Sequence, residues 1–310
     1  MSILAKASLQ QLQFSLSISQ QLADLRYKQG LNSARQSLSI DLLAGMAVKS
    51  QLSASKVMAS QDPSSHFNYQ QALAYLSQIK AQPLDTELIK SIHRQLNDQG
   101  GCWRDLKLKI SRRDLPDQYL TVPATEDAIA VAMESLVADY NQALQDGVEP
   151  LIAIPLLMME LMQTFPFFDG NRRLVLLLAR HLFHSHGYHI VEMVDLESEV
   201  VATERAFYRS LNQSDSPLAW LSYWWVLIGR LYQRFDRQVQ HANISAGRGS
   251  KTALIERYVK QQQRPFRYGE VCKAFPTISR DHIRMILRNL KEKKIIVTTG
   301  RGRSAVWTVC

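Results

Sequence analysis

Hydrophobic residues recur three or four positions apart through most of the chain, which is the spacing of one face of an α-helix, so a mainly α-helical fold is predicted. Residues 1–60 are rich in Gln, Ser and Leu at this spacing, and the interruption at Gly30 and Asn32 indicates two helices. The same spacing predicts that helices also dominate the chain downstream, over 69–79, 85–97, 125–145, 151–164 and 171–237.

Local signals mark where some of these elements begin and end. Asp85 is expected to cap the helix that follows it, because its carboxylate can accept from free backbone N–H groups. Gly147 is expected to end the helix over 125–145. Residues 106–122 alternate between apolar and polar side chains, which predicts a β-hairpin with Leu-Pro-Asp at 115–117 as its turn.

The last sixty residues follow a different pattern. Short amphipathic segments predict three helices over 251–262, 268–274 and 280–293, and two strands follow over 295–298 and 305–309. Residues 238–250 contain Asn243, Gly247 and Gly249, which favours a linker. The predicted organisation is therefore N-terminal helices (1–60), a helical domain (61–237), a linker (238–250) and a small C-terminal domain (251–310).

Charge separates the two ends of the chain. From Arg248 onward there are 15 Lys and Arg against 4 Asp and Glu, a net charge of +11, whereas the whole chain carries only +9. All of the excess positive charge therefore lies in the last fifth of the sequence. Such an asymmetry favours a polyanion as the partner of the C-terminal domain.

Other features narrow the class of protein. The three cysteines form no C-x-x-C pair, so neither a disulfide framework nor a zinc ribbon is expected. The most apolar run, 151–162, contains Pro155 and Glu160 and is too short for a bilayer span, which favours a buried helix. The N-terminus lacks the apolar segment of a signal peptide, so a cytoplasmic location is expected. Four histidines surround a helix end and a turn, and are not expected to face one metal: His181, His184, His186 and His189.

The segment between the helices predicted at 151–164 and 171 onward carries the clearest candidate chemistry. It reads Phe-Pro-Phe-Phe-Asp-Gly-Asn-Arg-Arg over 165–173. Gly170 permits a tight turn, and the first N–H groups of the following helix point toward an anion. Arg173 adds a planar fork for phosphate oxygens, and Asp169 offers oxygen to Mg²⁺. The predicted anion- or nucleotide-binding residues are Asp169, Gly170, Asn171, Arg172 and Arg173.

This segment resembles the signature of the Fic/Doc family, His-Pro-Phe-x-Asp/Glu-Gly-Asn-Gly-Arg-x-x-Arg. The resemblance implies a helical fold, ATP and Mg²⁺ as ligands, and transfer of AMP to a protein hydroxyl. Three positions depart from it, because the family's general base His is Phe165, its second Gly is Arg172 and its last Arg is Leu176. Phenylalanine has no titratable nitrogen, and a general base contributes roughly 10²–10⁴-fold, so no catalytic residue is assigned. Mg-nucleotide, another anion, or a scaffold without a ligand all remain open for this loop.

The resemblance extends on both sides of the loop. Ile89–Leu96 and Gly101–Arg104 are similar to the family's flanking helix and loop, in which His93 is expected to make a structural hydrogen bond. The hairpin over 106–123 is similar to the flap that docks a target peptide. Its basic residues could recruit an acidic peptide or nucleic acid, or form a solvated face: Lys107, Lys109, Arg112 and Arg113. The family's N-terminal inhibitory helix has only a weak match at 49–54, with Ser53 in place of Glu.

The C-terminal domain resembles a winged helix-turn-helix, in which the third helix enters the major groove and the wing touches the DNA backbone or minor groove. The resemblance implies Ser279 as the cap of that helix and a basic face beside it. The expected DNA-binding residues are Ser279, Arg280, His282, Arg284 and Arg288 on the helix, with Arg301 and Arg303 at the wing. The alternative is a domain of this type that contacts proteins.

Three functions are compatible with these patterns. The first is a regulator that binds duplex DNA through its tail, with a Fic-like body that forms a homo-oligomer or senses a ligand. The second is an adenylyltransferase that uses a substitute base. The third is a module that binds a peptide at the hairpin without further chemistry.

Overall fold

The computed structural model describes residues 3–5, 9, 12, 14–34, 40–59, 64–79, 83–97, 100–105, 109–112, 115–121, 126–212, 216–260, 262, 264–275, 278–300 and 305–309. The chain divides into two compact units, which are described separately: unit 1, Met1–Phe235, and unit 2, Asp236–Cys310.

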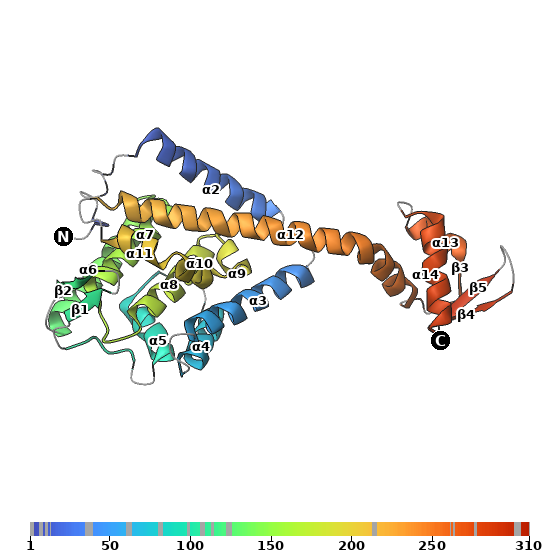
Figure 1. The fold of residues 1–310 in the computed structure, drawn as a ribbon, viewed down its shortest axis with the longest axis horizontal. Coiled ribbons are helices and arrows are strands. Elements are labelled where there is room, and N and C mark those ends of the chain that lie inside the picture. The colour runs from blue at the N-terminus through green and yellow to red at the C-terminus, as the bar shows by residue number, and fades with distance from the viewer. Residues whose placement is uncertain are drawn as a thin grey trace. The chain divides into compact units, whose positions relative to one another are not determined.

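Unit 1 is a bundle of helices with one small hairpin, which confirms the mainly α-helical fold (Figure 1). Two helices occupy the N-terminal region as predicted, but the first passes through Gly30 and Asn32, because an isolated glycine costs a helix only about 1 kcal/mol. The helices are α2 (Leu16–Ala34), α3 (Ile40–Ala59), α4 (Ser64–Gln78), α5 (Thr86–Leu96), α6 (Glu126–Gln145), α7 (Pro150–Thr164), α8 (Asn171–Ser185), α9 (Ile190–Met193), α10 (Leu196–Ala202), α11 (Glu204–Leu211) and the first part of α12 (Leu218–Lys260).

The predicted hairpin is present as β1 (Lys109–Arg112) and β2 (Leu115–Thr121), which pair antiparallel. The predicted turn at 115–117 is wrong, because these residues form the beginning of β2. The register shifts between Ser111 and Arg112, so that Arg112 faces Leu115. Near the start of a strand in a two-stranded sheet, Pro116 can face away from the ladder, where its missing N–H costs nothing.

Helix α7 forms the centre of unit 1, and most of its side chains are buried. Pro155 lies inside this helix and has no N–H to donate to the carbonyl of Leu151. The indole Nε1 of Trp225 in α12 donates to that carbonyl at 2.7 Å instead. Trp220, five residues earlier in α12, donates to the carbonyl of Pro155 at 2.6 Å. The tryptophans of α12 therefore belong to the core. None of the helices in the described ranges has the length and apolarity needed to cross a membrane.

A buried charged cluster joins three further helices of unit 1. Arg180 of α8 donates from Nε and Nη2 to the carboxylate of Glu197 in α10. The hydroxyl of Tyr69 in α4 donates to the same carboxylate at 2.7 Å. Since both charges are buried and hydrogen-bonded, removal of either partner would leave the other uncompensated.

Unit 2 contains the end of α12 and a small α+β arrangement. Helices α13 (Tyr268–Ala274) and α14 (Arg280–Glu292) are close to the predicted positions. The strands β3 (Phe266–Arg267), β4 (Ile296–Thr299) and β5 (Val306–Val309) form an antiparallel sheet in the order β3-β5-β4. Strand β3 is only two residues long, too short for an alternating pattern to predict it. The core of the unit includes Ile255, Val259, Phe266, Val271, Ile283, Ile286, Leu287, Leu290 and Ile296.

The backbone of residues 238–250 is helical, which corrects the expectation that helical structure ends near Arg237. Two glycines, Gly247 and Gly249, favoured a linker there. A glycine costs a helix about 1 kcal/mol, whereas a proline costs about 3 kcal/mol, and α12 contains no proline between Pro217 and Pro265. The predicted domain boundaries themselves remain a prediction.

Candidate functional site

The loop between α7 and α8 begins with a strained residue. Phe165 ends α7 in the left-handed region, at φ 50° and ψ 63°, a conformation that is rare for a side chain of this size. Arg104 stabilises it: its Nε donates to the carbonyl of Phe165 at 2.7 Å, and its backbone N–H donates to the carbonyl of Pro166 at 3.0 Å. Arg104 is fully buried, and this burial lowers the pKa of its guanidinium. A buried cation thus caps the carbonyl end of α7.

His93 of α5 holds the middle of the loop. The backbone N–H of Gly101 donates to its Nδ1 at 3.0 Å, so the opposite nitrogen, Nε2, carries the proton and donates to the carbonyl of Asp169 at 2.9 Å. Burial lowers the pKa of His93, which favours this neutral form. The ring also stacks on Phe167 with centroids 3.7 Å apart. These contacts confirm the structural hydrogen bonding expected of His93.

Two motif residues shape the turn itself. Gly170 adopts φ 73°, and a Cβ at this position would lie 3.3 Å from Nε2 of His93. Both conditions favour glycine. The side chain of Asn171 is buried, accepts from the N–H of Phe167 at 3.0 Å and donates to the carbonyl of Phe167 at 2.7 Å. What Asn171 could offer an anion is therefore its backbone N–H at the start of α8.

The two arginines that were predicted to bind an anion both contact carboxylates. Arg173 lies 3.3 Å from the carboxylate of Asp169, its neighbour one turn back. Arg172 turns toward α11, where it pairs with Glu204 and contacts Tyr208. Burial opposes the charge of Arg172, but Tyr208 and Glu204 outweigh that effect and raise its pKa. Both cations at the start of α8 are therefore already paired with a carboxylate.

The reactive positions of the family signature hold apolar side chains. Phe165 is half-buried at the position of the general base, and Leu176 is fully buried in α8 at the position of the last arginine. Asp169 is a single exposed carboxylate that already faces Arg173, so it offers Mg²⁺ one shared ligand. The groups in this loop that could hold an anion are the N–H groups at the start of α8 and Arg173.

The predicted DNA-binding residues fall into three groups. Ser279 caps α14 by accepting from the N–H of His282 at 3.4 Å, and Arg280, Arg284 and Arg288 are exposed. His282 turns the other way: its Nε2 lies 3.4 Å from the hydroxyl of Thr252 in α12. Two residues correspond to about 200° around a helix, which places His282 away from Arg280. The expected wing residues, Arg301 and Arg303, lie outside the described part of the chain.

Arg284 is the most constrained of the exposed arginines. Its guanidinium lies 5.3 Å from the ring centroid of Tyr268 in α13 and 3.3 Å from the carboxylate of Asp281. Arg288 lies 3.9 Å from the carboxylate of Glu292. The basic side of α14 is therefore interspersed with acids, all of which are exposed.

Two of the four histidines approach each other, a contact that the sequence pattern did not address. Nδ1 of His184 lies 3.1 Å from Nδ1 of His189 and 3.3 Å from the carboxylate of Glu192, at a cavity of about 510 Å³ between α8 and α4. The turn at Gly187 folds the chain back on itself, which spacing alone did not indicate. Within the described residues, no three potential ligands are arranged to hold a metal ion.

Sequence reasoning also missed some functional positions. It assigned Arg104 only to a matching segment, without a role, and it gave Glu204 none. The hairpin side chains expected to attract a peptide lie outside the described side chains, so that expectation remains a prediction.

Comparisons with known proteins agree with this geometry. The Fic/DOC family model matches residues 83–183, which include α5, the hairpin, α6, α7, the loop and most of α8. A Fic family protein from Desulfovibrio desulfuricans is 16% identical, with a TM-score of 0.58 over 96% of this chain and 97% of its own. A Fic domain containing signaling protein from Bacteroides thetaiotaomicron is 18% identical, with a TM-score of 0.56 over 69% of this chain and 94% of its own. Fic-1 from C. elegans is 13% identical, with a TM-score of 0.53 over 71% and 72% of the respective chains.

At these identities the structural matches speak for the fold alone, and no curated protein has significant similarity to this chain. The family model and the fold lead to the same conclusion. The chain carries a Fic/DOC family domain.

Proposed function

We propose that this protein is a DNA-binding regulator whose Fic-type site binds without catalysing AMP transfer. The observation that carries the proposal is the exposed side of α14, where Arg280, Arg284 and Arg288 follow one another at intervals of four residues. Residues four apart lie on the same side of a helix, so these three guanidinium groups present one basic edge to a polyanion.

The rest of unit 2 supports this use of α14. Ile283, Ile286, Leu287 and Leu290 anchor its opposite side in the core, so the basic side faces outward. The end of α12, α13, α14, β4 and β5 follow one another in the order predicted for residues 251–309, with the short strand β3 in addition, which supports a winged helix. Ser279 caps α14, and a capped helix start also suits a phosphate contact. The net charge of +11 over residues 248–310 supplies the long-range attraction that non-specific DNA binding requires.

The Fic loop supports the second half of the proposal. A target hydroxyl needs a proton acceptor, and the position of that acceptor holds Phe165. Leu176 is buried where the family places a phosphate-binding arginine, and Arg172 is paired with Glu204. We infer that the loop retains at most the binding of an anion, through the start of α8 and Arg173.

One observation favours the alternative, AMP transfer with a substitute base. The loop backbone is held by His93, Arg104 and Asn171, so the scaffold of the site is intact. Incubation of the native chain with labelled ATP, Mg²⁺ and candidate proteins tests this alternative. Label transfer that disappears in Asp169→Ala and Arg173→Ala would establish it and overturn the proposal of a non-catalytic site.

DNA binding is tested with the full chain and a fluorescent duplex of random sequence. Fluorescence anisotropy measured against salt concentration should give a steep log–log dependence, with a slope of about −0.9 for each phosphate contact. The double variant Arg284→Gln, Arg288→Gln should bind more weakly and with a slope shallower by about 1–2. The double variant Arg94→Gln, Arg205→Gln, which removes the same two charges at exposed positions of α5 and α11, is the control. A salt response that is flat, or equal effects of both charge changes, would refute the proposal.

A further inference from the structure

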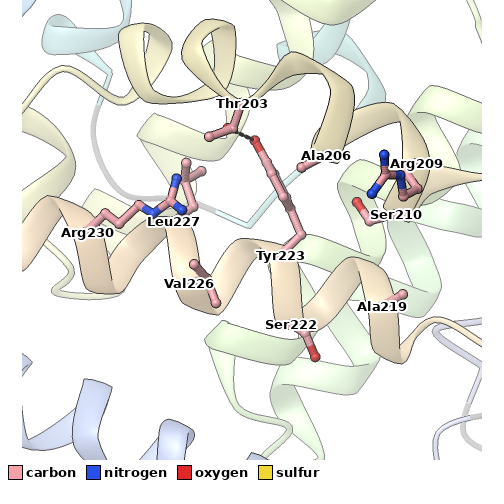
Figure 2. A pocket seen from close by; sticks show the side chains of 10 residues that line it. All are labelled: Thr203, Ala206, Arg209, Ser210, Ala219, Ser222, Tyr223, Val226, Leu227 and Arg230. Atoms are coloured by element: carbon pink, nitrogen blue, oxygen red, sulfur yellow. Dashed lines mark hydrogen bonds between the residues drawn. The ribbon is translucent and has the colours of Figure 1, made fainter. Parts of the chain in front are cut away.

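A cavity of about 290 Å³ lies between α11 and α12, outside the site described above (Figure 2). Its walls are mainly apolar and include Ala206 of α11 and Tyr223, Val226 and Leu227 of α12. Val226 is 45% exposed, so one side of the cavity opens to solvent. Its volume is at the lower end of the range of small-molecule pockets, about 300–1,000 Å³.

The cavity and the Fic loop lie on different sides of α11. Glu204 and Tyr208 contact Arg172 of the loop, whereas Ala206 lines the cavity. Adjacent helical residues are about 100° apart, so Ala206, two residues from both Glu204 and Tyr208, lies about 160° around the helix from each of them. A ligand in the cavity would therefore occupy a place distinct from an anion at the loop.

Two of the hydroxyl groups at the cavity, those of Thr203 and Tyr223, are engaged with each other. Thr203 donates to the carbonyl of Glu199 at 2.7 Å, so the hydroxyl of Tyr223 is the donor in its 2.9 Å contact with Thr203 (Figure 2). Burial raises the pKa of Tyr223 to about 12, so the phenol is neutral. Ser210 likewise donates to the carbonyl of Phe207, so the charged groups at the rim are the stronger candidates for recognition of a ligand.

Those charged groups are two arginines, one near each end of the cavity (Figure 2). Within the described residues, neither Arg209 nor Arg230 forms an ion pair with a carboxylate, although Arg172, Arg180 and Arg234 all do. Arg230 lines the cavity, and its charge acts on the hydroxyl of Tyr223. An apolar cavity with an unpaired guanidinium at its rim is chemically complementary to an apolar anion.

We propose that this cavity binds a small apolar carboxylate. Its hydrocarbon part lies on Ala206, Tyr223, Val226 and Leu227, and its carboxylate accepts hydrogen bonds from Arg230. Burial of the ligand covers apolar surface that is now partly exposed, and the ion pair forms beside a low-dielectric wall, where it is stronger than in water.

Isothermal titration calorimetry of the full chain with octanoate and with 1-octanol tests this proposal. Octanoate should bind about tenfold more tightly than the neutral alcohol, because only the carboxylate can pair with Arg230. Arg230→Gln should weaken octanoate to the level of the alcohol and leave the alcohol unchanged. Ala206→Phe, which fills the cavity, should abolish binding of both.

Matched variants separate this site from general electrostatics. Arg205→Gln removes the same charge from the solvent side of α11, and Ala202→Phe adds the same ring at an exposed position of α10; both should bind octanoate as the native chain does. Circular dichroism and thermal unfolding establish that each variant is folded. No heat of binding with octanoate at millimolar concentration, equal losses in Arg205→Gln and Arg230→Gln, or full binding by folded Ala206→Phe would each overturn the proposal.

Discussion

The guanidinium of Arg104 donates to the carbonyl of Phe165 at 2.7 Å. Phe165 ends α7 in a left-handed conformation, and this hydrogen bond holds it there. Arg104 comes from the segment that follows α5, so the loop is held by a part of the chain sixty-one residues away.

Replacement of Arg104 by Met should destabilise unit 1 by about 1.5–3 kcal/mol, because a charged hydrogen bond is lost and the carbonyl of Phe165 is left without its donor. Urea unfolding followed by tryptophan fluorescence measures this, since four of the five tryptophans lie in unit 1. Arg94→Met, at a half-exposed site in the same region, should change the free energy of unfolding by less than about 0.5 kcal/mol. Similar losses in both variants would contradict the capping role of Arg104.

Trp225 compensates for the proline in α7, and this relationship can be isolated by a double-mutant cycle. Trp225→Phe leaves the Leu151 carbonyl unpaired in the native chain, but Pro155→Ala restores a helical N–H to that carbonyl. The cost of Trp225→Phe should therefore be about 1–2 kcal/mol smaller in the Pro155→Ala background.

Trp220→Phe provides the control for this cycle. Trp220 donates to the carbonyl of Pro155, which remains after Pro155→Ala, so its cost should be the same in both backgrounds. Equal behaviour of the two tryptophans in urea unfolding would mean that the Trp225 hydrogen bond does not replace the missing backbone donor.

Gly170 should tolerate a methyl group less well than Gly147, although both adopt positive φ. Gly147→Ala should cost about 1–2 kcal/mol from the left-handed conformation alone, because no atom lies within 4 Å of the added Cβ. Gly170→Ala should cost about 1 kcal/mol more, because its Cβ would lie 3.3 Å from Nε2 of His93. Thermal unfolding of the two variants compares them, and equal costs would show that the loop yields to the methyl group.

Acid should destabilise unit 1 partly through His93. Its pKa is lowered in the folded protein, mainly by burial, so the unfolded chain takes up the proton more readily. The stability that His93 contributes is then fully present above its unfolded pKa of about 6.5, and it is lost as the pH falls through the lower pKa of the folded protein.

His93→Gln removes this titration, so the variant should be less stable at pH 7 but lose less stability between pH 7 and pH 5 than the native chain. Urea unfolding at both pH values measures the difference. His186→Gln is a useful comparison, since burial lowers the pKa of His186 as well, at the opposite end of α8 from the loop. A pH dependence unchanged by His93→Gln would contradict the assignment.

Much of the fold follows from local signals in the sequence. The cap at Asp85, the end of α6 at Gly147 and the apolar face of α14 all depend on neighbouring residues, and the structure has each of them as predicted. The errors arose where a long-range partner changes what a local signal means. Pro116 favoured a turn, but the pairing of β1 with β2 places it in a strand, and the glycines near 247 favoured a linker in a segment that is helical.

For the candidate site too, the sequence predicted some features and missed others that depend on distant residues. The motif indicated where Gly170 and Asn171 lie, but spacing cannot show the direction of a side chain. The amide of Asn171 turns back to Phe167, and Arg172 turns to Glu204, thirty-two residues later. His282 was placed on the basic side of α14 for its polarity alone, whereas its contact with Thr252 places it beside α12.

Because α7 contains Pro155, the chain should not be truncated at residue 183, where the match to the family model ends. A fragment ending at residue 183 would keep the whole signature yet lose α12, and with it both indole donors to α7. Helix α7, the most apolar of the described helices, would then lose the packing surface that α12 provides, and the carbonyl of Leu151 would have no donor. The shortest piece that can be expected to fold alone therefore extends at least to Phe235.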